Sequence, residues 1–310
     1  KETVGDDKVG SHFIAITDPG SKLEEFAKQH KFRHIFYGDP AIGGRYSALS
    51  DFGMIPSSIM GIDVSRLLQS TVKMVDACSP MSTIEKNPGV LFGLLFGLAA
   101  KSGRDKLTIF TSDSVSHLGA WLEQLVAEST GKLGRAIIPV EKELIGAPDS
   151  YGEDRIFVLL KLEGDDIGAQ DEAIEALSSA GHPVVRITIA NKYDLGQELF
   201  RFEIATAVAG SILAINPFNQ PDVEASKVAS RALTKAYETA GAFPPETPIF
   251  QDESVKLYTD ARNASYFKEA TGENQTLTAY LKAHLDRLSP CDYFALVAYL
   301  EMNDKNERLL

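Results

Sequence analysis

The sequence contains little cysteine and no long uninterrupted apolar segment. Its two cysteines, Cys78 and Cys291, lie far apart in 310 residues, which excludes a disulfide-rich scaffold. One disulfide stays open, but two thiols in a reducing compartment are favoured. The longest apolar run, Val90 to Ala100, is interrupted by Gly93 and Gly97 and is about half of the ~20 residues that a membrane helix needs. We therefore expect a buried helix there and no membrane partner.

Basic residues are in the minority. The chain has 43 acidic and 31 basic residues and a formal net charge of −12, whereas proteins that bind nucleic acid or anionic lipid present a basic stripe. We expect no nucleic-acid partner, so any phosphate has to be bound by local groups. The polar first dozen residues lack the apolar segment of a signal peptide, and we expect a cytoplasmic location.

The alternation of apolar clusters and helical periods predicts an α/β fold with a doubly wound, mainly parallel sheet. The clusters are rich in Val, Ile and Phe, as buried strands are. Strands are predicted at residues 12–17, 34–37, 107–111, 156–162, 184–189 and 293–300. Helices are predicted at residues 22–30, 55–78, 89–101, 115–129, 171–180, 195–214, 221–240 and 276–288.

The chain is predicted to have four parts. Residues 1–45 form the end of a first α/β subdomain, 46–104 a helical connection, 105–240 a second α/β subdomain, and 241–310 a turn-rich segment followed by a helix–strand unit. The first strand has no predicted partner strands before it, and the last residues read as the start of a helix. We therefore expect a part of a longer chain.

Paired glycines precede an arginine at Gly43-Gly44-Arg45, between a strand and a helix. Glycine allows positive φ and a close approach of the backbone to an anion, and Arg45 offers a planar fork for an oxyanion. These residues alone leave open an ordinary turn with a surface arginine.

A second candidate is Glu128, in the segment Gln124 to Lys132 (QLVAESTGK). The helix that contains it is expected to end at Gly131, which places Glu128 in the last turn. The negative end of the helix dipole favours proton uptake there, as a general base requires. A solvated glutamate is the alternative.

The third candidate segment runs from Ile215 to Lys227 (INPFNQPDVEASK). Pro221 and the acidic residues after it are typical of a helix start, and Lys227 follows about one and a half turns later. An ordinary exposed lysine is the alternative. The sequence contains no P-loop, no dinucleotide fingerprint and no zinc-ligand spacing, so we expect no metal and no cofactor.

Taken together and in this order, the three segments resemble the phosphoglucose isomerase family. The run IGGRYSALSDFGMIP (residues 42–56) is similar to the family's first signature and INPFNQPDVEASK to its second, while QLVAESTGK is similar to its Glu-Ser-x-Gly-Lys segment. The resemblance covers roughly residues 10–240. The sequence that connects the three segments, together with residues 241–310, is most similar to the isomerase part of bifunctional transaldolase/glucose-6-phosphate isomerase proteins.

The resemblance implies two sugar-isomerase-like subdomains that interconvert glucose 6-phosphate and fructose 6-phosphate through a cis-enediol, without a cofactor and as a homodimer. It implies that Glu128 moves the proton between carbons 2 and 1, that Arg45 stabilises the enediolate and that Lys227 helps to open the sugar ring. The implied substrate-binding residues are Gly43, Gly44 and Gln220.

The sequence departs from the family pattern in three places. The family's His-Ser-x-Gly stretch falls on Asp149 to Gly152, so the ring-opening histidine is missing from its expected place, and Asn219 replaces an aspartate. The family's phosphate-binding Ser/Thr loop would precede Lys1. A non-catalytic sugar-phosphate-binding module, or an incomplete part of a bifunctional transaldolase/isomerase, is therefore the alternative. No run of eight β/α units is present for a transaldolase barrel.

Overall fold

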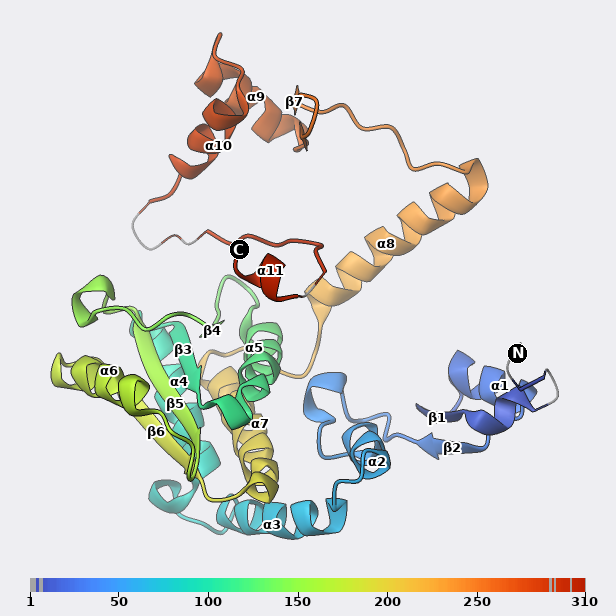
Figure 1. Cartoon of the computed structure of the whole chain (residues 1–310), viewed down its shortest axis with the longest axis vertical. Helices are drawn as coiled ribbons and strands as arrows, with labels where there is room; N and C mark the ends of the chain where they lie inside the picture. The colour runs from blue at the N-terminus through green and yellow to red at the C-terminus, as the bar shows by residue number, and fades with distance from the viewer. Residues whose placement is uncertain (1–3, 6–7, 290–291, 293, 302, 310) are drawn as a thin grey trace. The chain divides into compact units, whose positions relative to one another are not determined.

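The computed structural model of the protein describes all residues except 1–3, 6–7, 290–291, 293, 302 and 310. The chain divides into two compact units, residues 1–222 and 223–310 (Figure 1). None of the helices in the described part of the chain combines the length and the apolarity needed to cross a membrane.

The first unit begins with the predicted strand–helix–strand. Strands β1 (Ile14–Thr17) and β2 (His34–Tyr37) pair in parallel, and α1 (Lys22–Gln29) connects them. Ser21 caps α1, because its side chain accepts a hydrogen bond from the backbone N–H of Glu24. The chain then enters the short 3-10 helix η2 (Gly44–Tyr46), which carries Arg45.

The helical connection contains three helices, α2 (Asp51–Ile59), α3 (Val64–Ala77) and α4 (Pro88–Lys101). The single helix predicted over residues 55–78 is wrong. Gly61 adopts a φ of +88° and turns the chain, after which Asp63 caps α3 by accepting from the N–H of Arg66. The apolar periodicity continues across this break, which is why it did not reveal the turn.

A four-stranded parallel sheet forms the centre of the first unit and confirms the predicted fold class. Its order is β4-β3-β5-β6. The strands are β3 (Lys106–Thr111), β4 (Ile138–Glu141), β5 (Arg155–Leu162) and β6 (Val184–Ile189). Strand β4 was not predicted, because Pro139 breaks its pattern; it lies at the edge of the sheet, where a proline is tolerated.

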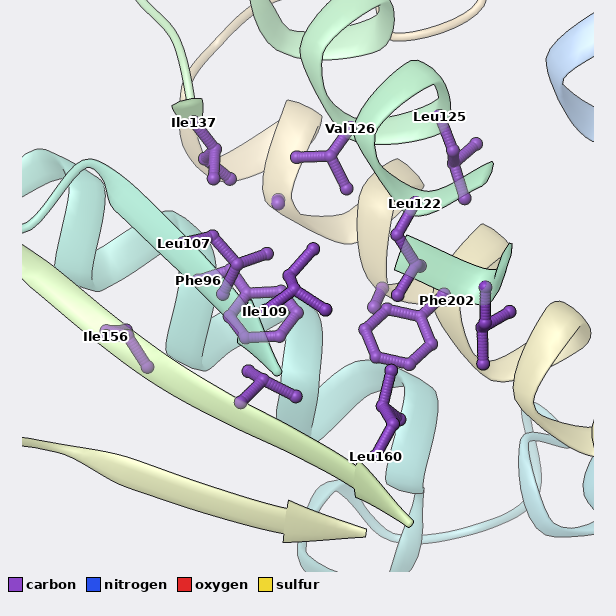
Figure 2. Close-up of a cluster of buried hydrophobic side chains, with 14 of the residues drawn as sticks. Phe96, Leu107, Ile109, Leu122, Leu125, Val126, Ile137, Ile156, Leu160 and Phe202 are labelled. Atoms are coloured by element: carbon purple, nitrogen blue, oxygen red, sulfur yellow. The ribbon is translucent and has the colours of Figure 1, made fainter. Parts of the chain in front are cut away.

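Helices cover both faces of this sheet, with α6 (Gly168–Ser179) on one face and α4, α5 (His117–Thr130) and α7 (Leu195–Ile212) on the other (Figure 1). The larger core lies on the second face. There Leu107, Ile109 and Leu160 of the sheet meet Phe96 of α4 and Phe202 of α7 (Figure 2). The apolar run predicted to be a buried helix is α4, which packs on α7. It is buried only in part, because Leu91, Leu95 and Leu98 are exposed.

The second unit contains α8 from Val223 onwards and a small C-terminal group of elements. Helix α8 (Pro221–Ala240) begins at the predicted proline, and α10 (Leu277–Leu285) also matches its prediction. The other elements are β7 (Phe250–Gln251), β8 (Lys256–Leu257), α9 (Ala261–Thr271) and α11 (Asp304–Glu307). The strand predicted over 293–300 is wrong for residues 294–300, which form no regular structure, and residue 293 lies outside the described residues.

The predicted disulfide alternative involves Cys78 and Cys291. Cys78 is a free thiol at the C-terminal end of α3, and burial raises the pKa of its thiol. Cys291 lies outside the described residues. Short 3-10 helices complete the fold: η1 (Val9–His12), η3 (Ile84–Lys86), η4 (Asp113–Val115), η5 (Pro148–Ser150) and η6 (Lys192–Asp194).

Candidate active site

Arg45 is buried at the centre of the candidate site. It is 5% exposed, and its two terminal nitrogens contact four acceptors. Nη1 donates to Ser129 Oγ at 2.5 Å and to the Pro217 carbonyl at 2.7 Å. Nη2 donates to the carbonyls of Phe218 and Asn219, both at 3.1 Å. The guanidinium is therefore held from two segments that lie far from it in the sequence.

Glu128 lies beside this guanidinium. Its Oε1 is 3.6 Å from Arg45 Nε, and its side chain is 23% exposed. Nε has no hydrogen-bond partner among the described residues. Glu128 lies in the last turn of α5, which ends at Thr130 with Gly131 as its C-cap, as predicted. The buried guanidinium of Arg45 and the partly accessible carboxylate of Glu128 are therefore next to each other.

The segment between α7 and α8 forms another side of the site. Lys132, which is 7% exposed, donates from Nζ to the carbonyl of Asn216 at 2.6 Å. Arg135 donates from Nη1 to the carbonyl of Leu213. Gln220 follows this segment with a half-buried side chain. Basic side chains therefore fix the backbone that leads to Gln220.

The site lies at the amino-terminal edge of the parallel sheet. Helix α5 starts after the carboxyl end of β3 and runs back, so that Glu128 reaches the edge where β4 begins. Helix α7 runs back in the same way after β6. The C-terminal ends of α5 and α7 therefore lie at the same edge of the sheet. The two helices are far apart in the sequence, so the sequence alone does not reveal this.

A second carboxyl group, that of Glu203 of α7, is half-buried near Tyr46, and its Oε1 is shielded from solvent. Burial raises the pKa of Glu203 to about 8. Burial also raises the pKa of Tyr46, the neighbouring Ser129 hydroxyl and Arg45 oppose this change, and Glu203 adds to it. Tyr46 Oη and Glu203 Oε1 both lack a hydrogen-bond partner among the described residues. With this pKa the Glu203 carboxyl is protonated at neutral pH.

Residues 1–153 match the family model for phosphoglucose isomerase, and this match includes Arg45 and Glu128. This part of the chain is similar to the phosphoglucose isomerases. A glucose-6-phosphate isomerase from Methanocaldococcus jannaschii is 30% identical over 69% of this chain and 61% of that protein. One from Prochlorococcus marinus is 28% identical over 95% of this chain and 60% of that protein. The chain thus spans about three fifths of the length of these curated relatives.

Solved structures support the same fold. A hypothetical protein from Thermus thermophilus has a TM-score of 0.66 and 24% identity, with 75% of this chain and 65% of that chain covered. A glucose-6-phosphate isomerase from Chlamydia trachomatis has a TM-score of 0.57 and 17% identity, over 76% of this chain and 54% of that chain. At these identities the likeness shows the fold alone.

The other positions taken from the phosphoglucose isomerase pattern have separate outcomes. Lys227 is an exposed residue of α8 and belongs to the second unit, so its role stays a prediction. The paired glycines do not adopt the positive φ that glycine allows. Gly43 has a φ of −74°, as the start of a 3-10 turn requires, and Gly44 is not among the positive-φ residues either. A Cβ built on either glycine would meet no atom within 4 Å.

Asp149, at the family's histidine position, lies in η5. Next to it, the Pro148 carbonyl accepts a hydrogen bond from His182 Nε2 at 3.0 Å, and the ring of Tyr151 packs edge-on against Phe157. Phe157 belongs to the core on the α6 face of the sheet, opposite the face that carries α5. The segment around Asp149 is thus anchored away from Glu128.

Sequence reasoning missed Lys132, Tyr46 and Glu203. Lys132 and Tyr46 stand inside the family motifs, next to residues that were named, so their positions offered a signal. Glu203 offered none, because a glutamate in a helix is usually solvated. In the described part of the chain, no three His, Cys, Asp or Glu side chains are grouped so that they could hold a metal ion.

Proposed function

We propose that this protein is an aldose–ketose isomerase that interconverts glucose 6-phosphate and fructose 6-phosphate through a cis-enediol intermediate. The observation that carries the proposal is the 3.6 Å separation between Glu128 Oε1 and Nε of the buried Arg45, in a chain related to the phosphoglucose isomerases. Both groups come from the segments that carry the family resemblance.

Glu128 is the proposed base. Its carboxylate takes the proton from carbon 2 of the open-chain aldose and returns it to carbon 1, so that the same group serves as base and then as acid. The side chain is 23% exposed, which leaves it accessible to a substrate. General base catalysis by a positioned carboxylate contributes roughly 10²–10⁴ in rate.

Arg45 is the proposed stabiliser of the enediolate. It is almost fully buried, and a cation in a water-excluded place acts more strongly on developing negative charge than a solvated one. Its Nε–H has no hydrogen-bond partner among the described residues and lies on the Glu128 side. This N–H is therefore the donor available to the oxygen on which charge develops.

Finer assignments accompany the proposal. Lys227 assists ring opening, while Gly43, Gly44 and Gln220 bind the sugar phosphate. The side chain of Gln220 is half-buried. We also propose a homodimer and a cytoplasmic location, and a longer parent chain that includes a transaldolase part. Molar mass in solution and the coding sequence around this region test the assembly and the fusion.

The test compares two glutamate variants on α5. E128Q removes the base without changing the size of the side chain, and we expect it to lower kcat for fructose 6-phosphate isomerisation by at least about 10²-fold. E123Q is the matched control, because Glu123 is exposed on the same helix and makes no ion pair with Arg45. The measurement is the rate of glucose 6-phosphate formation in a coupled dehydrogenase assay.

Equal loss in both variants, or full activity in E128Q, contradicts the assignment. A non-catalytic sugar-phosphate-binding module is the second candidate, because the residue at the family's histidine position, Asp149, is anchored on the α6 side. Binding of fructose 6-phosphate in calorimetry, with no turnover by the wild-type protein, favours that candidate.

A further inference from the structure

Two buried cations hold one short backbone segment. Arg45 and Lys132 are the basic residues that are buried in the part of the chain that the structure describes, at 5% and 7% exposure. Lys132 binds the Asn216 carbonyl, and Arg45 binds the carbonyls of the next three residues. Four consecutive acceptors in a segment without helix or strand are thus satisfied by cationic side chains.

This arrangement is costly for a segment that needs only hydrogen-bond donors. Neutral donors satisfy carbonyls with a smaller desolvation cost than buried cations. Burial lowers the pKa of Lys132, Arg45 contributes to the decrease, and Glu128 and Asp222 oppose it. Lys132 therefore lies among charged groups, with Arg45 as the neighbouring cation and Glu128 and Asp222 as the neighbouring carboxylates.

The hydrogen bonds of Arg45 limit what this residue can offer a substrate. A guanidinium has five N–H groups. The terminal nitrogens direct theirs to Ser129 Oγ and to the carbonyls of residues 217–219, so Nε alone is left without a partner among the described residues. The direction of this N–H depends on how firmly residues 217–219 are held.

We propose that Lys132 is a positioning residue of the isomerisation site. By holding the Asn216 carbonyl, its ammonium keeps residues 217–219 seated on Arg45 and keeps the Nε–H of Arg45 directed at the Glu128 side. The inference rests on the proposed function. It assigns to Lys132 no contact with the substrate.

Three variants separate the hydrogen bond from the charge. K132M removes both, K132Q keeps an N–H donor without charge, and K132R keeps donor and charge. We expect K132M to lower kcat by about 10- to 100-fold, the usual cost of a small misplacement. KM should change by less than about threefold, because binding of the ground state is retained. K132Q and K132R should recover most of kcat. K73M, at an exposed position of α3, is the matched control.

A measurement made without substrate separates the test of Lys132 from the test of the proposed function. The proton–nitrogen NMR signal of Arg45 Nε and the amide exchange of Phe218 and Asn219 should change in K132M and return toward wild type in K132Q. Fluorescence of Trp121 checks that each variant is folded. If the wild-type protein has no turnover, the proposed function fails, and the Arg45 signal still decides the role of Lys132.

The inference is overturned by wild-type kcat and an unchanged Arg45 signal in K132M. It is equally overturned if K132Q loses as much activity as K132M, because charge and not the hydrogen bond would then matter. A loss of kcat in K132M that follows only the unfolded fraction also contradicts it.

Discussion

At the scale of single residues, burial decides what the charged groups around Glu128 do. Arg45 is held by four protein acceptors, so its charge is fixed in place before a substrate arrives. Such preorganisation is the property that makes an electrostatic group effective in catalysis. Glu128 keeps partial exposure, as a group that has to meet a substrate must.

Glu203 gives a prediction about stability and pH. Burial raises the pKa of this carboxyl from 4.5 to about 8, so the folded state holds a proton that the unfolded state has released between these values. The contribution of this proton to the free energy of unfolding is complete below pH 4.5 and is lost as the pH rises through 8. It amounts to at most about 5 kcal/mol. E203Q cannot titrate there and should lack this part of the pH dependence.

Urea unfolding of the wild type and E203Q at pH 5, 7 and 8.5 checks this expectation. Trp121, the one tryptophan of the chain, lies on α5 and reports on the first unit. E203Q should gain stability relative to wild type as the pH rises, whereas the control E172Q, at an exposed position of α6, should follow the wild type. If the difference in the free energy of unfolding between E203Q and wild type is the same at all three pH values, the raised pKa of Glu203 is refuted.

Some of these residues could be predicted from the sequence and others could not. Glu128 and Arg45 stand in motifs with local signals, a helix end and a glycine pair before a turn. The pairing of Lys132 with the Asn216 carbonyl joins residues 84 positions apart, and the burial of Glu203 results from packing. Neither is encoded in the neighbouring sequence, so both required the fold.

At the scale of elements, the close approach of α4 and α7 is the clearest packing constraint. Glycines at every fourth position of α4 face α7. A Cβ on Gly93 would lie 2.5 Å from Val208 Cβ and 2.6 Å from the Ala205 carbonyl oxygen. The backbone atom cannot move without displacing α7. The glycines that interrupt the apolar run therefore allow two helices to pack closely beneath the sheet.

G93A tests this constraint. Alanine favours a helix over glycine by about 1 kcal/mol, so a gain in stability is the expectation from propensity alone. We expect a net loss of about 1–3 kcal/mol instead, because the added methyl overpacks the interface. G168A is the control, since a Cβ there would meet its nearest atom, Asp166 Oδ1, at 3.6 Å. Thermal unfolding of both variants gives the answer, and a G93A protein as stable as G168A refutes the packing argument.

The elements of the central sheet could be predicted because buried parallel strands are continuous apolar runs. The strand over 34–37, the strand over 184–189 and the helix over 221–240 were predicted with the bounds that the structure shows. The misses have physical causes. The helix predicted over residues 55–78 is interrupted because Gly61 turns the chain, although the apolar periodicity continues across the turn. Helix α9 was not predicted because it lies in a stretch with many turn residues.

At the scale of the whole molecule, an acidic chain has the two basic side chains that are buried among its described residues at one place. The formal net charge is −12, yet Arg45 and Lys132 lie together beside Glu128. The net charge of the chain does not reveal this local grouping of basic side chains. Arg45, Glu128 and Lys132 all belong to the first unit and lie within the residues that match the family model.

The exchange of a proton at carbon 2 tests the account most directly. The wild-type protein and E128Q are incubated with fructose 6-phosphate in deuterated water, and the glucose 6-phosphate formed is examined by NMR. The account predicts deuterium at carbon 2 with the wild type, because the proton held by Glu128 exchanges with solvent, and none with E128Q. Product without deuterium at carbon 2, or equal incorporation by E128Q, would contradict it.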